Sequence, residues 1–384
     1  MREDSHDASR IHMARQSSAV AGRTCAMSHA PTHAPRPGDA RRGPSKRGAI
    51  RRSGVIRPAL QTTAHNEQMQ YHVSCLAVLA IFAVVIAHAQ KLILTNDDGW
   101  AVAQIRAQRD SLVDAGFNVV LSCPADNRSG TGSSSAPPVP LQQPCEFNTC
   151  PTGSPAEGFN ASDPPLNYVN SFPVDAVRFG IQTLAPQFFG SAPDFVVSGP
   201  NVGNNLGTVT QNSGTVGAAC EAAKEGIPSV AFSASSVSQV SYTTLTSTPT
   251  SPATLSAFIY ATLTTTLTEA LLSPAARPIL PPGITLNVNY GSTTFSSSGA
   301  PSGDCTSASD FRWVFTRILP SSSATDVETC GSTKLPDEGT VVRAGCFASV
   351  SVMNASTKAD VDAAMQAAVL TRLEPSGLLT CFGG

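Results

Sequence analysis

The feature that most constrains the fold is a strand, helix and strand pattern that begins at residue 91. Residues 91–95 form a short apolar run, residues 101–115 carry apolar side chains at helical spacing, and residues 117–124 form a second apolar run. Segments of these lengths predict a βαβ unit, in which the two strands lie parallel because the helix carries the chain back. The chain from residue 91 is therefore expected to build a parallel sheet.

The same pattern recurs further along the chain. Residues 194–199 and 227–234 are strand-like, and residues 213–226 between them have helical spacing. This repetition predicts an α/β fold, namely a doubly wound, mostly parallel, Rossmann-like sheet with helices on both faces. Ligands of such sheets bind in the loops beyond the carboxyl ends of the strands, so these loops are the first candidates for function.

The chain beyond residue 250 is less regular. A helix is predicted over 253–272, a strand over 284–290 and an amphipathic helix over 358–373. The stretch 291–310 is rich in Gly and Ser, and four of the cysteines fall in this last third of the chain. We therefore expect an extended C-terminal arm in addition to the sheet.

A short apolar segment precedes the predicted sheet. It starts at Met69, which is the expected start of translation, runs unbroken over 75–87 and ends at the small-x-small site Ala87-His88-Ala89. These features indicate a secretory signal peptide cleaved after Ala89. A membrane helix is the alternative, but spanning a bilayer takes about 20 apolar residues, and this run has 13. We expect a secreted protein with no membrane span, starting at Gln90.

The sequence thus divides into three parts. Residues 1–68 are low in complexity and hold 12 of the 25 Lys and Arg residues, which predicts a disordered basic extension absent from the mature protein. A transit peptide is the alternative for this Arg-rich start, but its acidic residues count against it. Residues 69–89 are the signal peptide. Residues 90–384 form one domain, with 90–250 as its α/β core and 251–384 as its C-terminal part.

The composition beyond residue 89 excludes several mechanisms. Five of the 27 acidic and 12 of the 25 basic residues lie before residue 90, so the rest carries a formal charge of −9, unlike a protein that binds a nucleic-acid backbone. All seven histidines also lie before residue 90. The expected mature protein therefore has no Ser-His-Asp triad, no phosphohistidine and no histidine-ligated zinc.

Eight of the ten cysteines remain beyond residue 89, and an even number in a secreted chain indicates up to four disulfides. Their pairing stays open, because eight cysteines can pair in many ways. Asn-x-Ser sites at Asn160 and Asn354 fit glycosylation in the same compartment. Asn127 matches this pattern too, but its loop is among those expected at the functional site.

Two adjacent carboxylates follow the first predicted strand, in the sequence KLILTNDDGW. Asp97 and Asp98 fall where the chain turns, so both side chains can face one site. Two bare carboxylates side by side repel each other, and either a proton or a cation must relieve the repulsion. With no histidine available, a hard divalent ion, Mg²⁺ or Mn²⁺, is the natural partner. The alternative is a solvated turn with a helix N-cap, since Asp favours both positions.

Three further strand-end loops supply oxygen ligands and free backbone N–H groups. They are rich in Gly, Ser, Thr and Asn and comprise residues 126–135, 198–207 and 212–222. The last of them opens a helix with Ser-Gly-Thr, and a helix N-terminus presents unpaired N–H groups to an anion. Each loop alone is more often an ordinary turn, but together they lie at one edge of the predicted sheet and predict a site there.

Six motifs make the chain similar to the SurE family of metal-dependent nucleotidases and acid phosphatases: LILTNDDGW, NRSG, SFPVDAVRFG, SGPNVGNNLG, NSGTVGAACE and LPPGITLNVN, in this order. The resemblance is close over 91–235 and thinner over 280–355, where VVRAGCFASVSVMN is similar to the family's late strand. It implies a phosphomonoesterase that acts on nucleoside monophosphates or other small phosphate esters and uses a divalent ion. It also makes a homodimer through the C-terminal part plausible. The Ser- and Thr-rich stretch 235–252 departs from the family pattern, so the resemblance does not predict the outer pocket or its substrate preference.

The resemblance also implies roles for single residues. The metal ligands would be Asp97, Asp98, Ser129 and Asn201, and the residues around the phosphate would be Asn96, Gly199, Ser213, Gly214 and Thr215. Four protein oxygens around an octahedral ion leave two positions for water and a phosphate oxygen. Asp97 and Asp98 would be catalytic, with Asp97 as ligand and as base for the attacking water.

Other families fit the first strand end less well. A haloacid-dehalogenase-type phosphatase needs a nucleophilic aspartate where this chain has Asn96, and a nicotinamide-binding domain needs a Gly-x-Gly-x-x-Gly loop that is missing at this place. A secreted, non-catalytic anion-binding or surface-interaction protein with the same fold is the alternative to an enzyme. Metal-dependent release of phosphate from a model ester separates these two functions.

Overall fold

The computed structural model describes residues 89–235 and 238–383, so the predicted basic extension and nearly all of the predicted signal peptide lie outside the described residues. The described chain contains nine strands: β1 (Lys91–Thr95), β2 (Asn118–Pro124), β3 (Glu157–Asn160), β4 (Asp163–Val169), β5 (Phe195–Val202), β6 (Ser229–Ala234), β7 (Ile284–Tyr290), β8 (Arg312–Thr316) and β9 (Phe347–Asn354). Its α-helices are α2 (Ala103–Asp114), α3 (Pro173–Phe179), α4 (Ala185–Phe189), α5 (Gly214–Lys224), α6 (Thr244–Ser247), α7 (Pro252–Leu272), α8 (Glu338–Arg343) and α9 (Ala363–Leu373).

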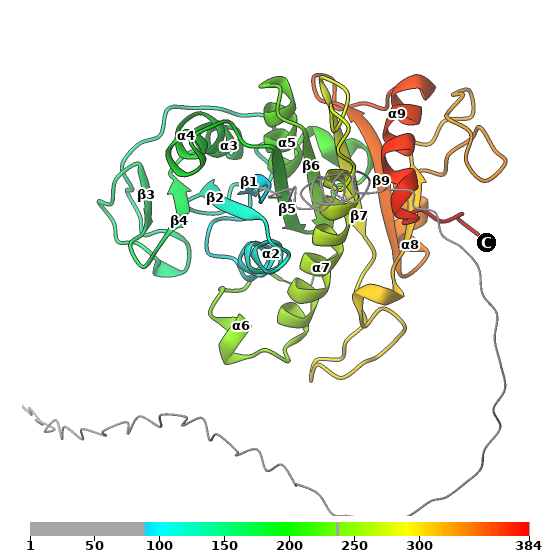
Figure 1. Cartoon of the computed structure of the whole chain (residues 1–384). Helices are drawn as coiled ribbons and strands as arrows, with labels where there is room; N and C mark the ends of the chain where they lie inside the picture. The colour runs from blue at the N-terminus through cyan, green and yellow to red at the C-terminus, as the bar shows by residue number, and fades with distance from the viewer. Residues whose placement is uncertain (1–88, 236–237, 384) are drawn as a thin grey trace, which may run out of the picture. The chain divides into compact units, whose positions relative to one another are not determined.

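All nine strands belong to one sheet, in the order β3-β4-β2-β1-β5-β6-β7-β9-β8 (Figure 1). The strands from β4 to β7 run parallel, whereas β3, β9 and β8 run in the opposite direction. The predicted doubly wound, mostly parallel α/β sheet is confirmed. Its first strand, β1, lies between β2 and β5, because the chain builds the sheet outward from β1 in both directions. The carboxyl ends of β1 and β5 therefore form the switch point at which such sheets bind ligands.

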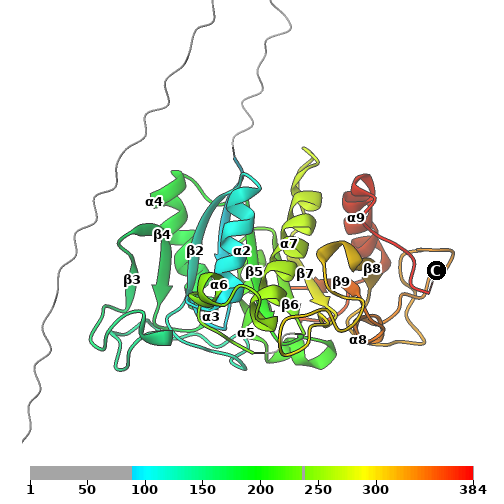
Figure 2. The same ribbon diagram turned by 90° about the horizontal axis from the view of Figure 1, so that it is seen from below.

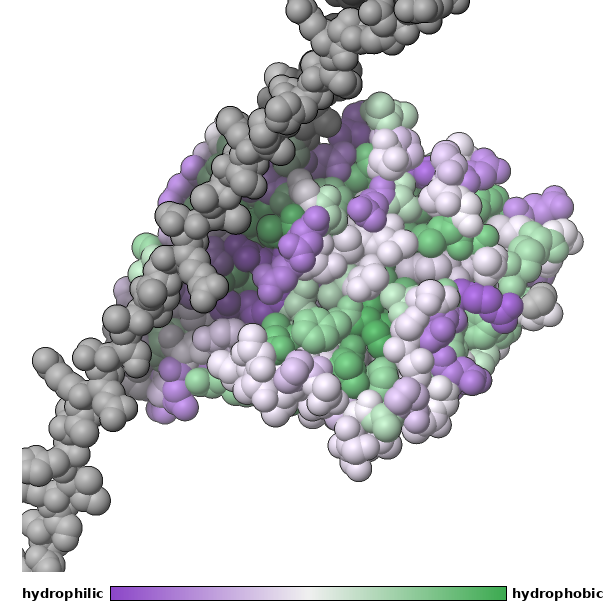
Figure 3. Space-filling view, turned by 60° about the horizontal axis from the view of Figure 1, so that its bottom comes forward, coloured by the Kyte–Doolittle hydropathy of each residue, from purple (hydrophilic) through white to green (hydrophobic). Residues whose placement is uncertain are grey.

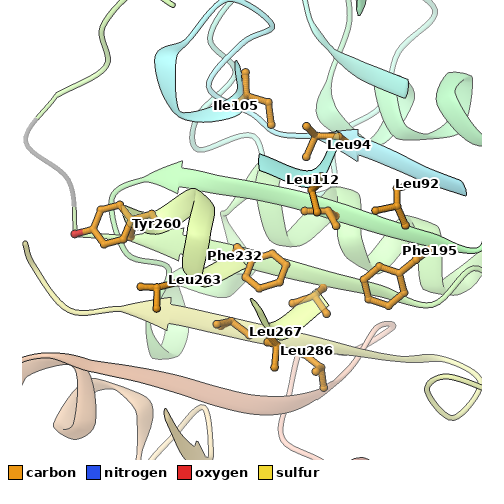
Figure 4. Close-up of a cluster of buried hydrophobic side chains, with 14 of the residues drawn as sticks. Leu92, Leu94, Ile105, Leu112, Phe195, Phe232, Tyr260, Leu263, Leu267 and Leu286 are labelled. Carbon is orange, nitrogen blue, oxygen red and sulfur yellow. The ribbon is translucent and has the colours of Figure 1, made fainter. Parts of the chain in front are cut away.

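Alternating side chains of the central strands bury against helices on the two faces of the sheet. Leu92 and Leu94 of β1 pack in one cluster with Ile105 of α2 and with α7 (Figure 4). Ile93, between them in sequence, packs on the opposite face with α3 and α5 residues. Figures 1 and 2 show α2 and α7 on one face of the sheet and α3 and α5 on the other. This alternation follows from the two-residue period of a strand, and each buried Leu or Ile stabilises the fold by about 1.5–3 kcal/mol.

The C-terminal part joins the same sheet. Strands β7, β9 and β8 extend it beyond β6, and the expected arm takes the form of these strands with long connections at 291–311 and 317–337. The helix predicted over 358–373 begins at 363, because Asp362 caps it by accepting a hydrogen bond from the Met365 N–H. Among the described residues, α7 alone is long and apolar enough to cross a membrane, but most of it is buried inside the protein, as in a core helix.

Three disulfides link parts of the described chain: Cys145 with Cys150, Cys305 with Cys346, and Cys330 with Cys381. The last two fasten the long connections of the C-terminal part to the sheet and to the chain end. Cys123 and Cys220 are buried and unpaired, and they pack in different hydrophobic clusters. The structure thus pairs six of the eight cysteines for which up to four disulfides were predicted.

Candidate functional site

Asp97 and Asp98 lie directly beyond β1, at the switch point of the sheet. The two residues are only 2% and 0% exposed. The N-cap position of the helix that follows, α2, is Val102 rather than either aspartate, and no side chain caps this helix. The structure therefore contradicts the alternative of a solvated turn with an aspartate N-cap and places both carboxyl groups inside the protein.

Asp97 is held by the N-terminus of α5. Its Oδ2 accepts a hydrogen bond from the Gly214 N–H at 3.0 Å, and its Oδ1 accepts one from the Thr215 hydroxyl at 2.6 Å. A side chain at Gly214 would clash, because its Cβ would lie 2.8 Å from the Asp97 Cβ. Ser213 caps the helix, its Oγ accepting from the Val216 N–H at 3.0 Å. The N-terminus of α5 thus contacts a carboxyl group of the protein, and its role as a phosphate site stays a prediction.

Asp98 contacts two segments that are distant in sequence. Its Oδ2 accepts a hydrogen bond from the Val202 N–H of β5 at 2.8 Å, and its Oδ1 accepts one from the Gln239 side-chain amide. The Gln239 Oε1 in turn accepts from the Asn127 amide at 2.9 Å. Gln239 therefore joins Asp98 to the loop that follows β2.

The electrostatics of the pair disfavour two bare charges. Burial raises the pKa of Asp97, and it raises the pKa of Asp98 well above its usual value, with the Asp97 charge as the next cause. No ion pair of the described residues involves either aspartate. The described residues contain no cluster of three or more His, Cys, Asp and Glu, so a metal ion here would rest on this pair and on neutral oxygens. Such a donor set fits a hard divalent ion.

Asn201 lies on β5 next to this pair. Its Oδ1 is 3.3 Å from the Thr215 Oγ1, the same atom that contacts Asp97. Gly199, two residues earlier, has φ +106°, and a Cβ there would lie 2.2 Å from the Phe232 carbonyl oxygen of β6. A glycine is required at this position because the backbones of β5 and β6 approach so closely. The structure thus brings Asn201 to the carboxylates and gives Gly199 a backbone role.

Asn96 and Ser129 differ in their connection to the site. The Asn96 amide donates to the Gly99 carbonyl at 2.9 Å and accepts from the Gly99 N–H at 3.2 Å, which closes the turn that carries both aspartates. Ser129 is exposed, and its loop is tied to the site by the Arg128 N–H, which donates to the Asp97 carbonyl oxygen at 2.7 Å. Its assignment as a metal ligand stays a prediction.

Comparison with known proteins now identifies the family. The family model described as Survival protein SurE matches residues 92–309. The chain belongs to the SurE family. It is 34% identical over 310 residues to an acid phosphatase of Yarrowia lipolytica, covering 73% of this chain and 84% of that protein.

Bacterial members of the SurE family match a shorter part. The chain is 36% identical over 146 residues to 5'-nucleotidase SurE of Gloeobacter violaceus, covering 38% of this chain and 50% of that protein. It is similar to the crystal structure of the SurE protein from Aquifex aeolicus, with 22% identity, a TM-score of 0.46, and coverage of 69% of this chain and 93% of that one. The chain thus spans about half the length of the bacterial nucleotidase and most of the length of the fungal phosphatase.

The sequence analysis missed two residues at this SurE-family site. Gln239 lies in the Ser- and Thr-rich stretch 235–252, which carries no motif of its own. Glu146 lies in the loop closed by Cys145 and Cys150, and a Cβ at Gly99 would be 2.3 Å from its Oε2. Burial raises the pKa of Glu146 to about 8, and its Oε2 is buried without a hydrogen-bond partner. Only the short cysteine spacing could have marked this loop as rigid.

Proposed function

We propose that this protein is a divalent-metal-dependent phosphomonoesterase that hydrolyses nucleoside monophosphates or other small phosphate esters. The observation that carries the proposal is the pair of buried carboxyl groups at the switch point, which have no cationic partner among the described residues. The relatives support the reaction class, because they are named acid phosphatase and 5'-nucleotidase.

The residues present fit a hard metal ion. Asp97, Asp98 and Asn201 would hold it, with Ser129 completing the set, and the choice between Mg²⁺ and Mn²⁺ is open. A bound ion of this kind acidifies water and neutralises charge on a phosphate. Thr215 and Gly214 orient Asp97 through their hydrogen bonds, so that one of its oxygens can take a proton from the attacking water. The N-terminus of α5 favours the negative charge of the phosphoryl group.

The proposal includes secretion. A signal peptide ending at Ala89 would place the chain in an oxidising compartment, where the three disulfides form. The intact mass of secreted protein checks this, with Gln90 expected as the first residue and six cysteines oxidised. A mature chain that keeps residues 1–68, or that has eight free thiols, contradicts it. A homodimer is also proposed, and sedimentation of the purified protein tests it.

Phosphate release tests the activity. The purified protein is assayed with nucleoside 5'- and 3'-monophosphates and with 4-nitrophenyl phosphate, with and without a chelator, and then with Mg²⁺ or Mn²⁺ restored. Release that the chelator abolishes and the ion restores supports the proposal. Release that is unaffected by the chelator contradicts metal dependence. Binding of phosphate without hydrolysis of any ester would instead favour the non-catalytic anion-binding protein.

A further inference from the structure

Gln239 contacts the candidate site although it belongs to the stretch 235–252, which departs from the SurE family pattern. The residue is half-buried, and its side-chain amide bonds at one end to Asp98 and at the other end to Asn127. Hydrophilic and hydrophobic residues lie next to each other over the face shown in Figure 3, so the hydropathy of that face indicates no further site. The contacts of a single side chain such as Gln239 are more specific.

Backbone pairing sets Gln239 in place beside Asp98. Residues 240–242 pair with residues 101–103 through two backbone hydrogen bonds of 2.8 and 2.9 Å. The helix α6, which follows this segment, lies against α2 (Figures 1 and 2). Because Gln239 directly precedes the paired segment, its backbone stays close to the turn that carries Asp98 as long as this pairing holds.

Arg106 of α2 holds the same paired segment by its side chain. Its guanidinium lies 4.8 Å from the ring centre of Tyr242, and its Nε donates to the Trp100 carbonyl oxygen at 2.6 Å. A guanidinium over an aromatic ring is attracted to the face of that ring, so Arg106 joins the two sides of the pairing. The place of Gln239 is therefore built by contacts on both sides of the segment that follows it.

A chain of hydrogen bonds runs from Asp98 to the backbone of Ser129. The Gln239 amide donates to the Asp98 Oδ1, and the Gln239 Oε1 accepts from the Asn127 amide at 2.9 Å. The Asn127 Oδ1 in turn accepts from the Ser129 N–H at 2.8 Å. Ser129 is exposed, so the position of its loop relative to Asp98 depends on links of this kind. Gln239 is the side chain in the middle of this link.

Gln239 leaves Asp98 able to hold an ion. A carboxylate offers about four lone-pair sites, and among the described residues Asp98 uses one for Gln239 and one for the Val202 N–H at 2.8 Å. The other sites stay available to a cation. Donors of this kind fix the orientation of a ligating carboxylate, and their loss typically lowers metal affinity by about 10- to 100-fold. Gln239 is therefore expected to support metal binding and not to compete with it.

We infer that Gln239 is a positioning residue of the metal site, which sets the affinity for the divalent ion by holding Asp98 and the Ser129 loop in one arrangement. The inference rests on the proposed metal-dependent phosphatase function and adds to it a residue outside the family motifs. In this role Gln239 does not touch the reacting atoms, because it acts through Asp98 and Asn127.

Gln239→Met tests this role, because methionine keeps the approximate length of the side chain and removes both hydrogen bonds. Calorimetric titration of the metal-free protein with Mn²⁺ should give a Kd about 10 to 100 times that of wild type. At saturating Mn²⁺, kcat for 4-nitrophenyl phosphate should stay within about threefold of wild type. Gln182→Met is the matched control, since the Gln182 amide also donates to a carboxylate, that of Glu225, at 3.0 Å. Glu225 is no proposed ligand, so the Kd of this control should equal that of wild type.

Asn127→Ala breaks the same link at its other end and keeps Gln239. It should also weaken Mn²⁺ binding, and the double variant Gln239→Met/Asn127→Ala should lose less affinity than the product of the two single losses, because both changes break one chain of bonds. Inhibition of N-glycosylation during expression keeps Asn127 unmodified in every protein. Equal melting temperatures of the metal-free proteins confirm that the variants are folded.

The outcomes separate the role of Gln239 from the reaction. If wild type binds Mn²⁺ and Gln239→Met binds it equally or more tightly, the inference is overturned and the phosphatase function stands. An equal loss in Gln182→Met, or a kcat that stays low at saturating Mn²⁺, overturns the positioning role as well. Single losses that multiply in the double variant overturn the link to the Ser129 loop. A wild type that binds no Mn²⁺ contradicts both the inference and the proposed metal dependence.

Discussion

Two regions bury carboxyl groups that have no cationic partner among the described residues, and the two regions stabilise these groups differently. One holds Asp97 and Asp98 at the carboxyl end of β1. The other holds Glu338, the first residue of α8, whose Oε1 accepts from the Gly207 N–H at 2.7 Å. The Glu338 Oε2 accepts from the Asn287 amide at 2.9 Å and from the Ser351 hydroxyl at 3.0 Å. Burial raises the pKa of Glu338 to about 8.

The difference shows what distinguishes a structural buried acid from a functional one. A single carboxyl group can remain protonated among neutral donors at neutral pH, so Glu338 requires no ion. The aspartates are adjacent, and the charge of Asp97 adds to the burial that raises the pKa of Asp98, so both groups can be charged together only if a cation lies between them. Such a pair is relieved by a cation between the two groups. Two adjacent buried carboxyl groups at the switch point of the sheet, rather than burial of an acid alone, therefore indicate a functional site.

The largest expected effect is that of Asp97→Asn. The variant loses the negative charge that holds a hard cation and the group that accepts a proton, so phosphate release should fall by about 10² to 10⁴ fold. The fold should survive, because an amide oxygen can still accept from the Gly214 N–H and the amide nitrogen can donate to the Thr215 hydroxyl. Phosphate release and melting curves of both proteins measure the effect.

Glu338→Gln is the matched control for that substitution. It also replaces a buried acid with its amide, but Glu338 bonds to Gly207, Asn287 and Ser351, none of which is a proposed ligand. Its activity should stay within about threefold of wild type, as expected for a group that does not touch the reacting atoms. Equal activity of Asp97→Asn and wild type would end the metal-site hypothesis. A loss in Glu338→Gln as large as in Asp97→Asn would remove the distinction between the two regions.

Metal binding should stabilise the folded protein, and this effect can be measured without catalysis. Mn²⁺ at about 100 times its Kd should raise the free energy of unfolding of wild type by about 2.7 kcal/mol, because it binds the folded state alone. The same addition should stabilise Glu338→Gln equally and Asp97→Asn much less. Denaturant unfolding with and without Mn²⁺ gives the values. Stabilisation of all three proteins to the same extent would place the ion elsewhere.

The sequence predicted the central sheet well because its signals are local. Strands β1, β2, β6 and β7 and helices α2, α5 and α7 fall within about two residues of their predicted ranges, since apolar periodicity and turn residues mark them. The edge strands β3 and β8 and the strand β4 next to β3 were not predicted. β4 and β8 pair with strands distant in sequence, β2 and β9. β3 and β4 form a hairpin, but β4 starts with Asp163-Pro164-Pro165, which is typical of a turn.

At the candidate site, too, the sequence predicted the residues whose signal is local and missed those placed by distant contacts. Asp97 was predicted because it follows a strand with a clear pattern, whereas Asn201 was predicted only through the resemblance to the SurE family. Gln239 reaches Asp98 across 141 residues of chain, and Glu146 reaches Gly99 through a loop whose path a disulfide fixes. No local pattern encodes such contacts, because they arise from the packing of loops on the finished sheet.

A smaller effect is expected for Ser129→Ala. This substitution removes one neutral oxygen from an exposed loop, so metal affinity should fall by about tenfold, the lower end of the cost of losing a supporting group. Excess Mn²⁺ should restore most of the activity, in contrast to Asp97→Asn. Activity titrated against Mn²⁺ concentration shows the difference. An unchanged titration curve would remove Ser129 from the set of ligands.

The smallest expected effect is the pH dependence of stability that comes from Glu338, and it shows whether Glu338 is protonated in the folded protein. Its folded-state pKa of about 8 lies above the ordinary value of 4.5, so between these pH values the folded state holds a proton that the unfolded state has lost. Its contribution to stability is therefore fully present below pH 4.5 and is lost as the pH rises through about 8. The decline cannot exceed about 1.4 kcal/mol per pH unit, the limit for one proton.

Glu338→Gln removes this proton and keeps most of the contacts. The amide oxygen can accept from the Gly207 N–H, and the amide nitrogen can donate to the Ser351 hydroxyl, while Asn287 keeps its bond to the Asn205 carbonyl oxygen. Any lost hydrogen bond costs the same at every pH, so it shifts the stability curve without changing its slope. Between pH 4.5 and about 8 the variant should lose stability less steeply than wild type, as measured by denaturant unfolding. Parallel curves would mean that Glu338 is ionised when folded, and a lone buried acid would then need a cation as much as the pair does.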